Sequence, residues 1–216
     1  IYLGTAFIAT FFNVAVVYCA KKRFEGGNPT FGEGLSEAIK RVHLIFMWSM
    51  VSAVVGLILN MIESAARESK SDLTRIILSI TSSILGAAWG IVSVFVVPAM
   101  VFDNVGPFAA LKKSAGAIKK TWGESLVRHY GLGLVQAAFM LLGVLVLIPG
   151  IFLLGIIWPI GLGLILVSVI YLVVVVLLFS TANTIFNTAL YMYAEGKHQK
   201  AFPAEIMKNA FETRKN

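Results

Sequence analysis

The chain has 216 residues, of which 58% are apolar and 13% are charged, with a formal net charge of +7. Soluble domains carry about 25% charged residues, so this composition and a mean hydropathy of +0.84 exclude a water-soluble globular protein. The single cysteine, Cys19, excludes an intrachain disulfide and argues against Cys-based zinc binding or redox chemistry. The composition predicts an all-α integral membrane protein, a helical bundle.

Apolar stretches long enough to cross a bilayer as α-helices recur along the chain. A hydrocarbon core of about 30 Å needs roughly 20 apolar residues in a helix. The last stretch, 130–194, is too long for one crossing, so a cluster of Gly and Pro residues between 149 and 163 is expected to turn the chain or to hold a re-entrant piece. The five predicted spans are about 1–20, 44–62, 76–102, 130–150 and 163–193.

Lysines and arginines are divided unevenly between the connecting segments. Segments 21–43, 103–129 and 195–216 carry five each, whereas segment 63–75 carries three, balanced by three acidic residues. Because positively charged loops are retained in the cytoplasm, we expect a multi-pass protein of the cell membrane with a cytoplasmic C-terminus. The basic tail 195–216 is expected to contain a short amphipathic helix. The chain opens within an apolar run at Ile1, so upstream sequence is expected to be missing.

Two of the cytoplasmic segments are predicted to form amphipathic helices at the membrane surface. They share the pattern G-x-x-x-A-[IL]-K-[KR], which starts at Gly34 in one segment and at Gly106 in the other. Chance and an internal duplication explain this shared pattern equally well. Such helices are either connectors that obey the positive-inside rule or docking sites for anionic lipid or an acidic partner. The candidate docking residues are Lys40, Arg41, Lys112, Lys113, Lys119, Lys120 and Trp122.

Motifs that carry catalytic chemistry are missing from the sequence. No predicted span contains a charged residue, which argues against a proton pump, a carboxylate-coupled symporter or a voltage sensor. The three histidines lack a metal-binding spacing, and there is no nucleophile elbow, phosphate loop or paired-carboxylate motif. We therefore expect no enzymatic activity, cofactor, metal or nucleic-acid partner.

Small and polar residues mark three features inside the spans. Pro98 is expected to kink the third span. A small-residue ridge in that span predicts the close approach of another helix, and a polar stripe in the last span predicts either interhelical hydrogen bonds or a substrate groove. The ridge consists of Ser82, Gly86 and Gly90, and the stripe of Ser180, Asn183, Thr184 and Asn187.

The stretch 97–114, with Pro98, Asp103, Gly106 and the run Ala110-Leu111-Lys112-Lys113-Ser114, resembles an uncharacterised prokaryotic family of multi-span membrane proteins. Residues 121–124 (Thr-Trp-Gly-Glu) and 11–15 (Phe-Phe-Asn-Val-Ala) also resemble that family. The family is similar in pattern to the membrane domain attached to some glycerophosphodiester phosphodiesterases, but their catalytic domain is absent here. The resemblance implies a bundle of about six helices, one of them upstream of Ile1, and it supplies no activity.

These features favour a non-enzymatic membrane scaffold or accessory subunit. It would bind anionic lipid and either join a membrane-protein complex or form a homo-oligomer. The alternative is a transporter or channel for a lipid or a small neutral solute, built on the polar stripe. The lack of charged residues in the spans favours the scaffold.

Overall fold

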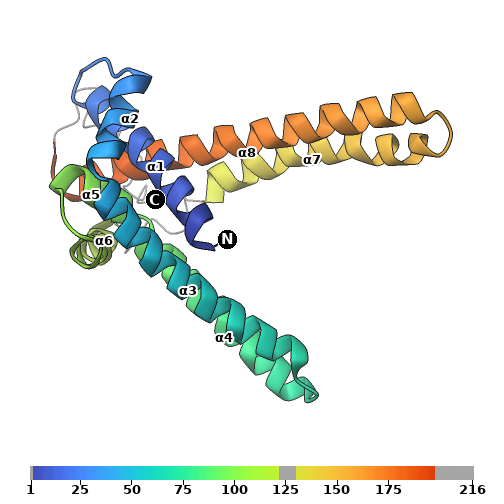
Figure 1. The fold of residues 1–216 in the computed structure, drawn as a ribbon, viewed down its shortest axis with the longest axis horizontal. Coiled ribbons are helices and arrows are strands. Elements are labelled where there is room, and N and C mark those ends of the chain that lie inside the picture. The colour runs from blue at the N-terminus through green and yellow to red at the C-terminus, as the bar shows by residue number, and fades with distance from the viewer. Residues whose placement is uncertain (1, 122–129, 198–216) are drawn as a thin grey trace, which may run out of the picture. The chain divides into compact units, whose positions relative to one another are not determined.

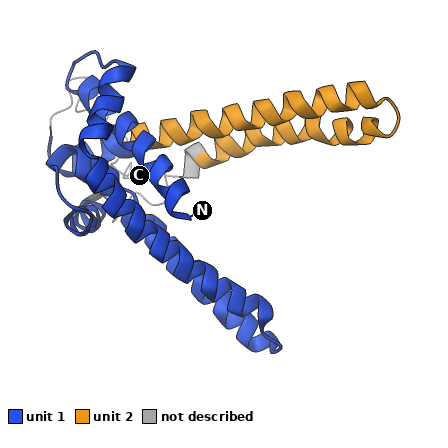
Figure 2. Cartoon of the chain, in the orientation of Figure 1, with its two compact units in different colours: residues 1–122, 187–216 blue, residues 123–186 orange. Residues whose placement is uncertain are grey.

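The computed structural model describes residues 2–121 and 130–197, which form helices joined by short turns, with no strand in these ranges (Figure 1). The chain divides into two compact units (Figure 2): unit 1 comprises residues 1–122 and 187–216, and unit 2 comprises residues 123–186. The helices are α1 (Tyr2–Phe24), α2 (Phe31–Lys40), α3 (Val42–Glu68), α4 (Asp72–Ser93), α5 (Val96–Asp103), α6 (Pro107–Thr121), α7 (Tyr130–Leu154) and α8 (Trp158–Ala194).

Within residues 2–121 and 130–197, five helical stretches are long and apolar enough to cross a membrane, which confirms the predicted number of spans. They extend beyond the uncharged runs because charged residues continue the helices at their ends, as Glu63 and Arg67 do in α3. The chain is therefore an all-α multi-pass membrane protein. The stretches are Tyr2–Phe24, Val42–Glu68, Asp72–Asp103, Gly133–Leu154 and Trp158–Ala194.

The third span is not one continuous helix, because α4 ends at Ser93 and α5 begins at Val96. Pro98 lies in the first turn of α5, where backbone N–H groups need no intrahelical acceptor. In an uninterrupted helix its ring would clash with the carbonyl group of Val94. The kink expected at Pro98 is thus a break just before it, at residues 94–95.

The turn between α7 and α8 is narrower than the Gly and Pro cluster that predicts it, and it occupies residues 155–157. Pro149 lies inside α7, and Pro159 lies in the first turn of α8. Within the described residues no re-entrant piece separates the two helices. Gly161 belongs to α8, where a Cβ would lie 2.5 Å from the backbone nitrogen of Leu154, so this glycine allows a tight hairpin rather than forming the turn itself.

The two segments that share a sequence pattern both form short helices that fold back on the preceding span. Helix α2 packs on α1, and α6 packs on α5 and α4. Ala38 and Ala110, which occupy the same position of the pattern, are both fully buried. Gly34 lies so close to α1 that a Cβ would be 2.8 Å from Cys19 Sγ.

The main core of unit 1 forms around α5, whose residues from Val96 to Val101 are buried. One cluster joins Trp48 of α3, Phe95, Met100 and Tyr191 of α8. The Trp48 ring stacks on Trp89 of α4, with ring centroids 5.5 Å apart. This core fixes the end of α5, where the polar residues described next gather.

Candidate functional site

Asp103, the last residue of α5, is the centre of a polar cluster in unit 1. Its Oδ2 accepts hydrogen bonds from Tyr191 Oη at 2.6 Å and from Lys113 Nζ at 3.0 Å, and its Oδ1 accepts one from Lys197 Nζ at 2.9 Å. The Asp103 side chain is 16% exposed, and Tyr191 is fully buried. The Asp103 carboxylate accepts all three bonds, so all three are charge-assisted, and this cluster, the Asp103 junction, fastens α6 and the end of α8 to α5.

Aromatic rings extend the Asp103 junction towards α1. Lys197 Nζ lies 4.9 Å from the ring centroid of Phe102 and 5.8 Å from that of Tyr191. Lys21 Nζ, at the end of α1, also lies 4.9 Å from the Phe102 centroid. All three distances fall within the range of about 6 Å in which a cation is attracted to an aromatic face. Phe102 therefore links α1 to the junction.

The backbone after Asp103 turns sharply enough to return α6 onto α5. Asn104 has φ of 49°, a left-handed conformation that asparagine tolerates better than most residues, and its N–H donates to the Met100 carbonyl group at 3.1 Å. Helix α6 begins at Pro107, and one and a half turns later Lys113 reaches Asp103. The left-handed cap thus brings the two ion-pair partners together.

Ser114 satisfies the backbone groups that the break between α4 and α5 leaves free. Its hydroxyl group accepts a hydrogen bond from the Phe95 N–H at 3.1 Å and donates one to the Val92 carbonyl group at 2.6 Å. Ser114 is fully buried. A buried backbone group without a partner costs roughly 1–3 kcal/mol, so Ser114 both stabilises the break and holds α6 against it.

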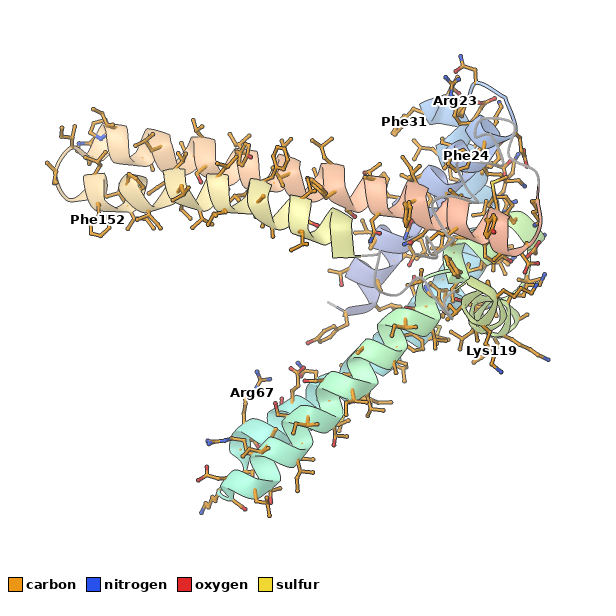
Figure 3. The ribbon with its side chains drawn as sticks, turned by 180° about the vertical axis from the view of Figure 1, so that it is seen from behind. Arg23, Phe24, Phe31, Arg67, Lys119 and Phe152 are labelled. Carbon is orange, nitrogen blue, oxygen red and sulfur yellow. The ribbon has the colours of Figure 1, made fainter. Side chains whose placement is uncertain are left out.

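The lysines of α6 fall into two pairs. Lys113 binds Asp103, and Lys120 Nζ lies 3.5 Å from Glu195 Oε1. Lys112 and Lys119 are exposed, and no carboxylate in the described part of the chain lies within ion-pair distance of either (Figure 3 labels Lys119). Of the residues expected to dock lipid on α6, Lys112 and Lys119 therefore carry the unpaired charge. Trp122 lies outside the described residues.

The two basic candidates at the end of α2 share one carboxylate. Lys40 Nζ lies 2.6 Å from Glu37 Oε1, and Arg41 forms an ion pair with Glu37 Oε2. The hydrogen bond from Lys40, together with that from Arg41, lowers the pKa of Glu37 below its ordinary value. The Arg41 side chain is 16% exposed, whereas that of Lys40 is 65% exposed. Lys40 is therefore the accessible member of the pair.

Helices α2 and α6 place small residues inward and some of their large apolar residues outward, while Leu35, Leu111 and Ile118 are partly buried against the core. In α2, Gly34 and Ala38 are buried, whereas Phe31 is 76% exposed and Ile39 is 61% exposed. In α6 the buried face contains Ala110, Ser114 and Ala117, whereas Phe108 is 73% exposed. Figure 3 labels Phe31 on the surface of α2. A helix on a water-soluble protein has the opposite arrangement.

The predicted polar stripe of α8 has both exposed and enclosed members. Ser180 and Asn183 are exposed. The Thr184 hydroxyl group donates to the Ser180 carbonyl group of the same helix at 3.1 Å. Asn187 is half-buried, and its Oδ1 is buried without a hydrogen-bond partner among the described residues. Among the described residues, the stripe thus ends at an amide oxygen that has no hydrogen-bond partner.

The predicted small-residue ridge of α4 faces α3 only in part. Ser82 is buried, and its hydroxyl group donates to Glu63 Oε1 of α3 at 3.3 Å. A Cβ on Gly86 would make an ordinary contact of 3.9 Å with Leu59, and a Cβ on Gly90 would meet no atom within 4 Å. Much closer helix contacts occur between α7 and α8.

Asp103, Ser114 and Tyr191 were not predicted as site residues from the sequence. Asp103 is the first charged residue after a long apolar run, and both it and Ser114 belong to the stretch that carries the family resemblance, which is the signal that points to them. Tyr191 has no comparable signal because its partner lies 88 positions away in the chain. No group of three metal-ligating side chains that could hold an ion occurs within residues 2–121 and 130–197.

Comparison with known proteins identifies a family without assigning a function. Residues 1–201 match the family of unknown function DUF6159. No curated protein and no solved structure matches the chain. Nothing ties the chain to the glycerophosphodiester phosphodiesterases, so the similarity to their membrane domain is unsupported. The match to the family of unknown function covers most of the sequence. The chain therefore belongs to the family of unknown function DUF6159.

Proposed function

We propose that this protein is a non-enzymatic membrane scaffold that docks anionic lipid through α2 and α6, in the role of an accessory subunit or a homo-oligomer. The outward position of large apolar residues on these two helices is the observation that carries the proposal. Phe31 and Phe108 are 76% and 73% exposed, while small residues of the same helices are buried. Exposed phenylalanines are unfavourable in water but favourable at the boundary between headgroups and acyl chains.

The charge on the same helices supports an anionic rather than a neutral lipid. Segment 21–43 carries five basic and three acidic residues, and the described part of the next segment, 103–121, carries four basic residues and one acidic residue. Lys112 and Lys119 lie on the exposed side of α6 together with Phe108. Long lysine side chains reach anionic headgroups while neighbouring apolar side chains stay in the interface.

The lipid dependence of thermal unfolding tests this proposal on the full chain in mild detergent. Phosphatidylglycerol should raise the unfolding midpoint more than phosphatidylcholine with the same acyl chains, and salt should reduce the difference. Each basic residue near an anionic surface contributes about 1 kcal/mol, so Lys112→Gln and Lys119→Gln should each weaken the apparent affinity for phosphatidylglycerol about fivefold.

Lys70→Gln, at the tip of the α3–α4 hairpin, is the matched control because it removes the same charge from a position outside α2 and α6. It should leave the response to phosphatidylglycerol unchanged. Equal midpoints with the two lipids, or a double Lys112→Gln/Lys119→Gln variant that responds like the unaltered protein, would contradict lipid docking through α6.

A transporter or channel for a lipid or small neutral solute is the second candidate, favoured by Asn187 in the polar stripe. Its Oδ1 and that of Asn13 in α1 are buried without partners among the described residues, and a passing water or polar solute would satisfy such acceptors. In proteoliposomes a transporter would pass small neutral solutes at a rate that Asn187→Leu abolishes. A scaffold would leave the membrane tight in both cases.

A further inference from the structure

A groove of about 470 Å³ lies between α3 and α4 near the tip of their hairpin. Glu63 and Arg67 line it from α3, and Arg75, Ser79 and Ser83 line it from α4. Figure 3 shows Arg67 projecting from the hairpin near this tip. The groove belongs to unit 1, but it lies at the end of the α3–α4 hairpin remote from the Asp103 junction, and neither the family match nor the proposed function assigns it a role.

Small residues make the groove, and its walls differ in polarity. Ser79 and Ser83 are one turn apart on α4, and Ala66 faces them from α3. Ile76 and Ile80 line the groove as well and are 53% and 54% exposed. The groove therefore combines charged side chains near the end of a membrane span with an apolar wall, which suits an amphipathic ligand.

Arg67 presents unused hydrogen-bond donors to the groove. Its guanidinium group lies 4.0 Å from Glu63 Oε2, beyond hydrogen-bond distance, and donates to no other group in the described part of the chain. The side chain is 68% exposed. Arg75, in contrast, donates to Asp72 at 2.8 Å. A guanidinium group with free donors in a fork is well matched to a phosphate group.

Glu63 presents an acceptor beside these donors. The Ser82 hydroxyl group donates to Glu63 Oε1 at 3.3 Å from the facing helix, which orients the carboxylate, while Oε2 forms a long ion pair of 4.0 Å with Arg67 and accepts no hydrogen bond from a described residue. The groove thus offers one cationic and one anionic group next to each other. A ligand that carries a phosphate and an ammonium group complements both.

We propose that this groove binds the headgroup of phosphatidylethanolamine, a zwitterionic phospholipid with a primary ammonium group. Its phosphate binds Arg67, its ammonium group donates to Glu63, and its acyl chains follow Ile76 and Ile80 into the hydrocarbon. Segment 63–75 has three basic and three acidic residues, a balance that matches a zwitterion better than an anionic lipid. The trimethylammonium group of phosphatidylcholine has no N–H to donate, so Glu63 discriminates against it.

Native mass spectrometry of the full chain, released from detergent with one defined lipid at a time, tests the proposal. The probes are phosphatidylethanolamine, phosphatidylcholine and phosphatidylglycerol with identical acyl chains. We expect the unaltered protein to retain phosphatidylethanolamine about tenfold better than phosphatidylcholine. Glu63→Gln should remove this preference, and Arg67→Gln should weaken retention of both lipids about tenfold because both carry a phosphate.

Two variants outside the groove serve as matched controls. Glu68→Gln removes a carboxylate from the same helix, and Lys70→Gln removes a cation from the adjoining turn. Both should retain the preference for phosphatidylethanolamine. The proposal is overturned if Glu63→Gln keeps the preference, if Glu68→Gln loses it equally, or if phosphatidylglycerol is retained better than phosphatidylethanolamine. The double variant Lys112→Gln/Lys119→Gln should leave the preference for phosphatidylethanolamine intact. A failure of the groove proposal is therefore distinguishable from a failure of the proposal that α6 docks anionic lipid.

Discussion

Unit 1 and unit 2 are each stabilised internally by a different kind of interaction. Unit 1 contains the Asp103 junction, in which a carboxylate binds two lysines and a tyrosine. In unit 2, α7 and α8 approach each other at glycines: a Cβ on Gly143 would lie 2.4 Å from Leu172 Cδ2. The Ser168 hydroxyl group also donates to the Gly143 carbonyl group at 2.6 Å. Charged side chains thus fasten unit 1, whereas small residues and backbone groups fasten the hairpin.

This difference follows from the surroundings of each contact. Lipid tails are as apolar as leucine side chains, so apolar burial gives two membrane helices little reason to associate, and close backbone packing at small residues becomes important. Ion pairs are expensive inside hydrocarbon but are accommodated at the ends of spans, where water and headgroups are near. The Asp103 junction lies at such an end, and the described core of the hairpin, residues 133–186, contains no Asp, Glu, Lys or Arg.

The largest effect is expected for Gly161→Ala, which tests whether close packing holds the hairpin. The added Cβ would lie 2.5 Å from Leu154 N and 2.9 Å from the Gly150 carbonyl oxygen, and these backbone atoms cannot move aside as a flexible side chain would. Overpacking of this kind costs typically 1–3 kcal/mol, and we expect about 3 kcal/mol or more here. The unfolding midpoint in mild detergent should fall by several degrees.

Gly163→Ala is the control in the same helix, since a Cβ there would meet no atom within 4 Å. Alanine favours a helix over glycine by up to about 1 kcal/mol, so this variant should be neutral or slightly stabilised. Equal losses for Gly161→Ala and Gly163→Ala would show that the close approach is not what holds α7 to α8.

A smaller effect is expected for Tyr191→Phe, which weakens the Asp103 junction of unit 1 without changing the packing of the ring. A hydrogen bond to a charged group contributes about 1.5–3 kcal/mol, and Lys113 and Lys197 remain to hold Asp103, so we expect a loss near 1.5 kcal/mol. Thermal unfolding measures it. Tyr2→Phe, at a residue 48% exposed at the start of α1, should have no effect. A Tyr191→Phe variant as stable as the unaltered protein would show that the hydrogen bond from Tyr191 to Asp103 does not stabilise unit 1.

The membrane fold could be predicted from composition and periodicity, because long uncharged runs have few alternatives in a bilayer. The ends of the helices could not be predicted in this way, because charged residues such as Glu63 and Arg67 continue α3 past its apolar run. The site of tight packing was also missed. Glycines near Pro149 predicted a turn, but Gly150 and Gly161 lie inside helices where α7 and α8 pack tightly against each other, and the same residue type signals both situations.

The candidate site could be predicted only where its residues are near one another in sequence. The amphipathic character of α6 was evident, but its buried face is formed by Ala110, Ser114 and Ala117, whereas Phe108 points outward. Hydrophobic periodicity does not tell which apolar residues of a helix are covered: Leu111 and Ile118 pack partly against the core, whereas Phe108 is exposed. The Asp103 junction depends on Tyr191 and Lys197, whose distance along the chain hides the contact from any local pattern.

The smallest effect is expected from Glu33 in the first turn of α2. Its contribution to stability should depend on pH, whereas the packing of unit 2 should not. Hydrogen bonds from Lys22, first, and from the backbone N–H of Thr30 lower the pKa of Glu33 below its ordinary value of 4.5. A carboxyl group whose pKa is lowered by folding stabilises the folded state fully above pH 4.5, and this contribution disappears as the pH falls through the lowered pKa.

Glu33→Gln should therefore reduce the unfolding midpoint slightly at pH 7, and the difference from the unaltered protein should close as the pH falls below 4.5. Glu25→Gln, in the turn before α2, removes a carboxylate that forms no ion pair among the described residues, so it should leave the midpoint at pH 7 unchanged. Residues 133–186 of the hairpin contain no Asp, Glu or His, so the same acid range should not weaken the contact between α7 and α8. If Glu33→Gln lowers the midpoint equally at every pH, its effect is one of packing, and the ion pair between Lys22 and Glu33 would not contribute to the stability of unit 1.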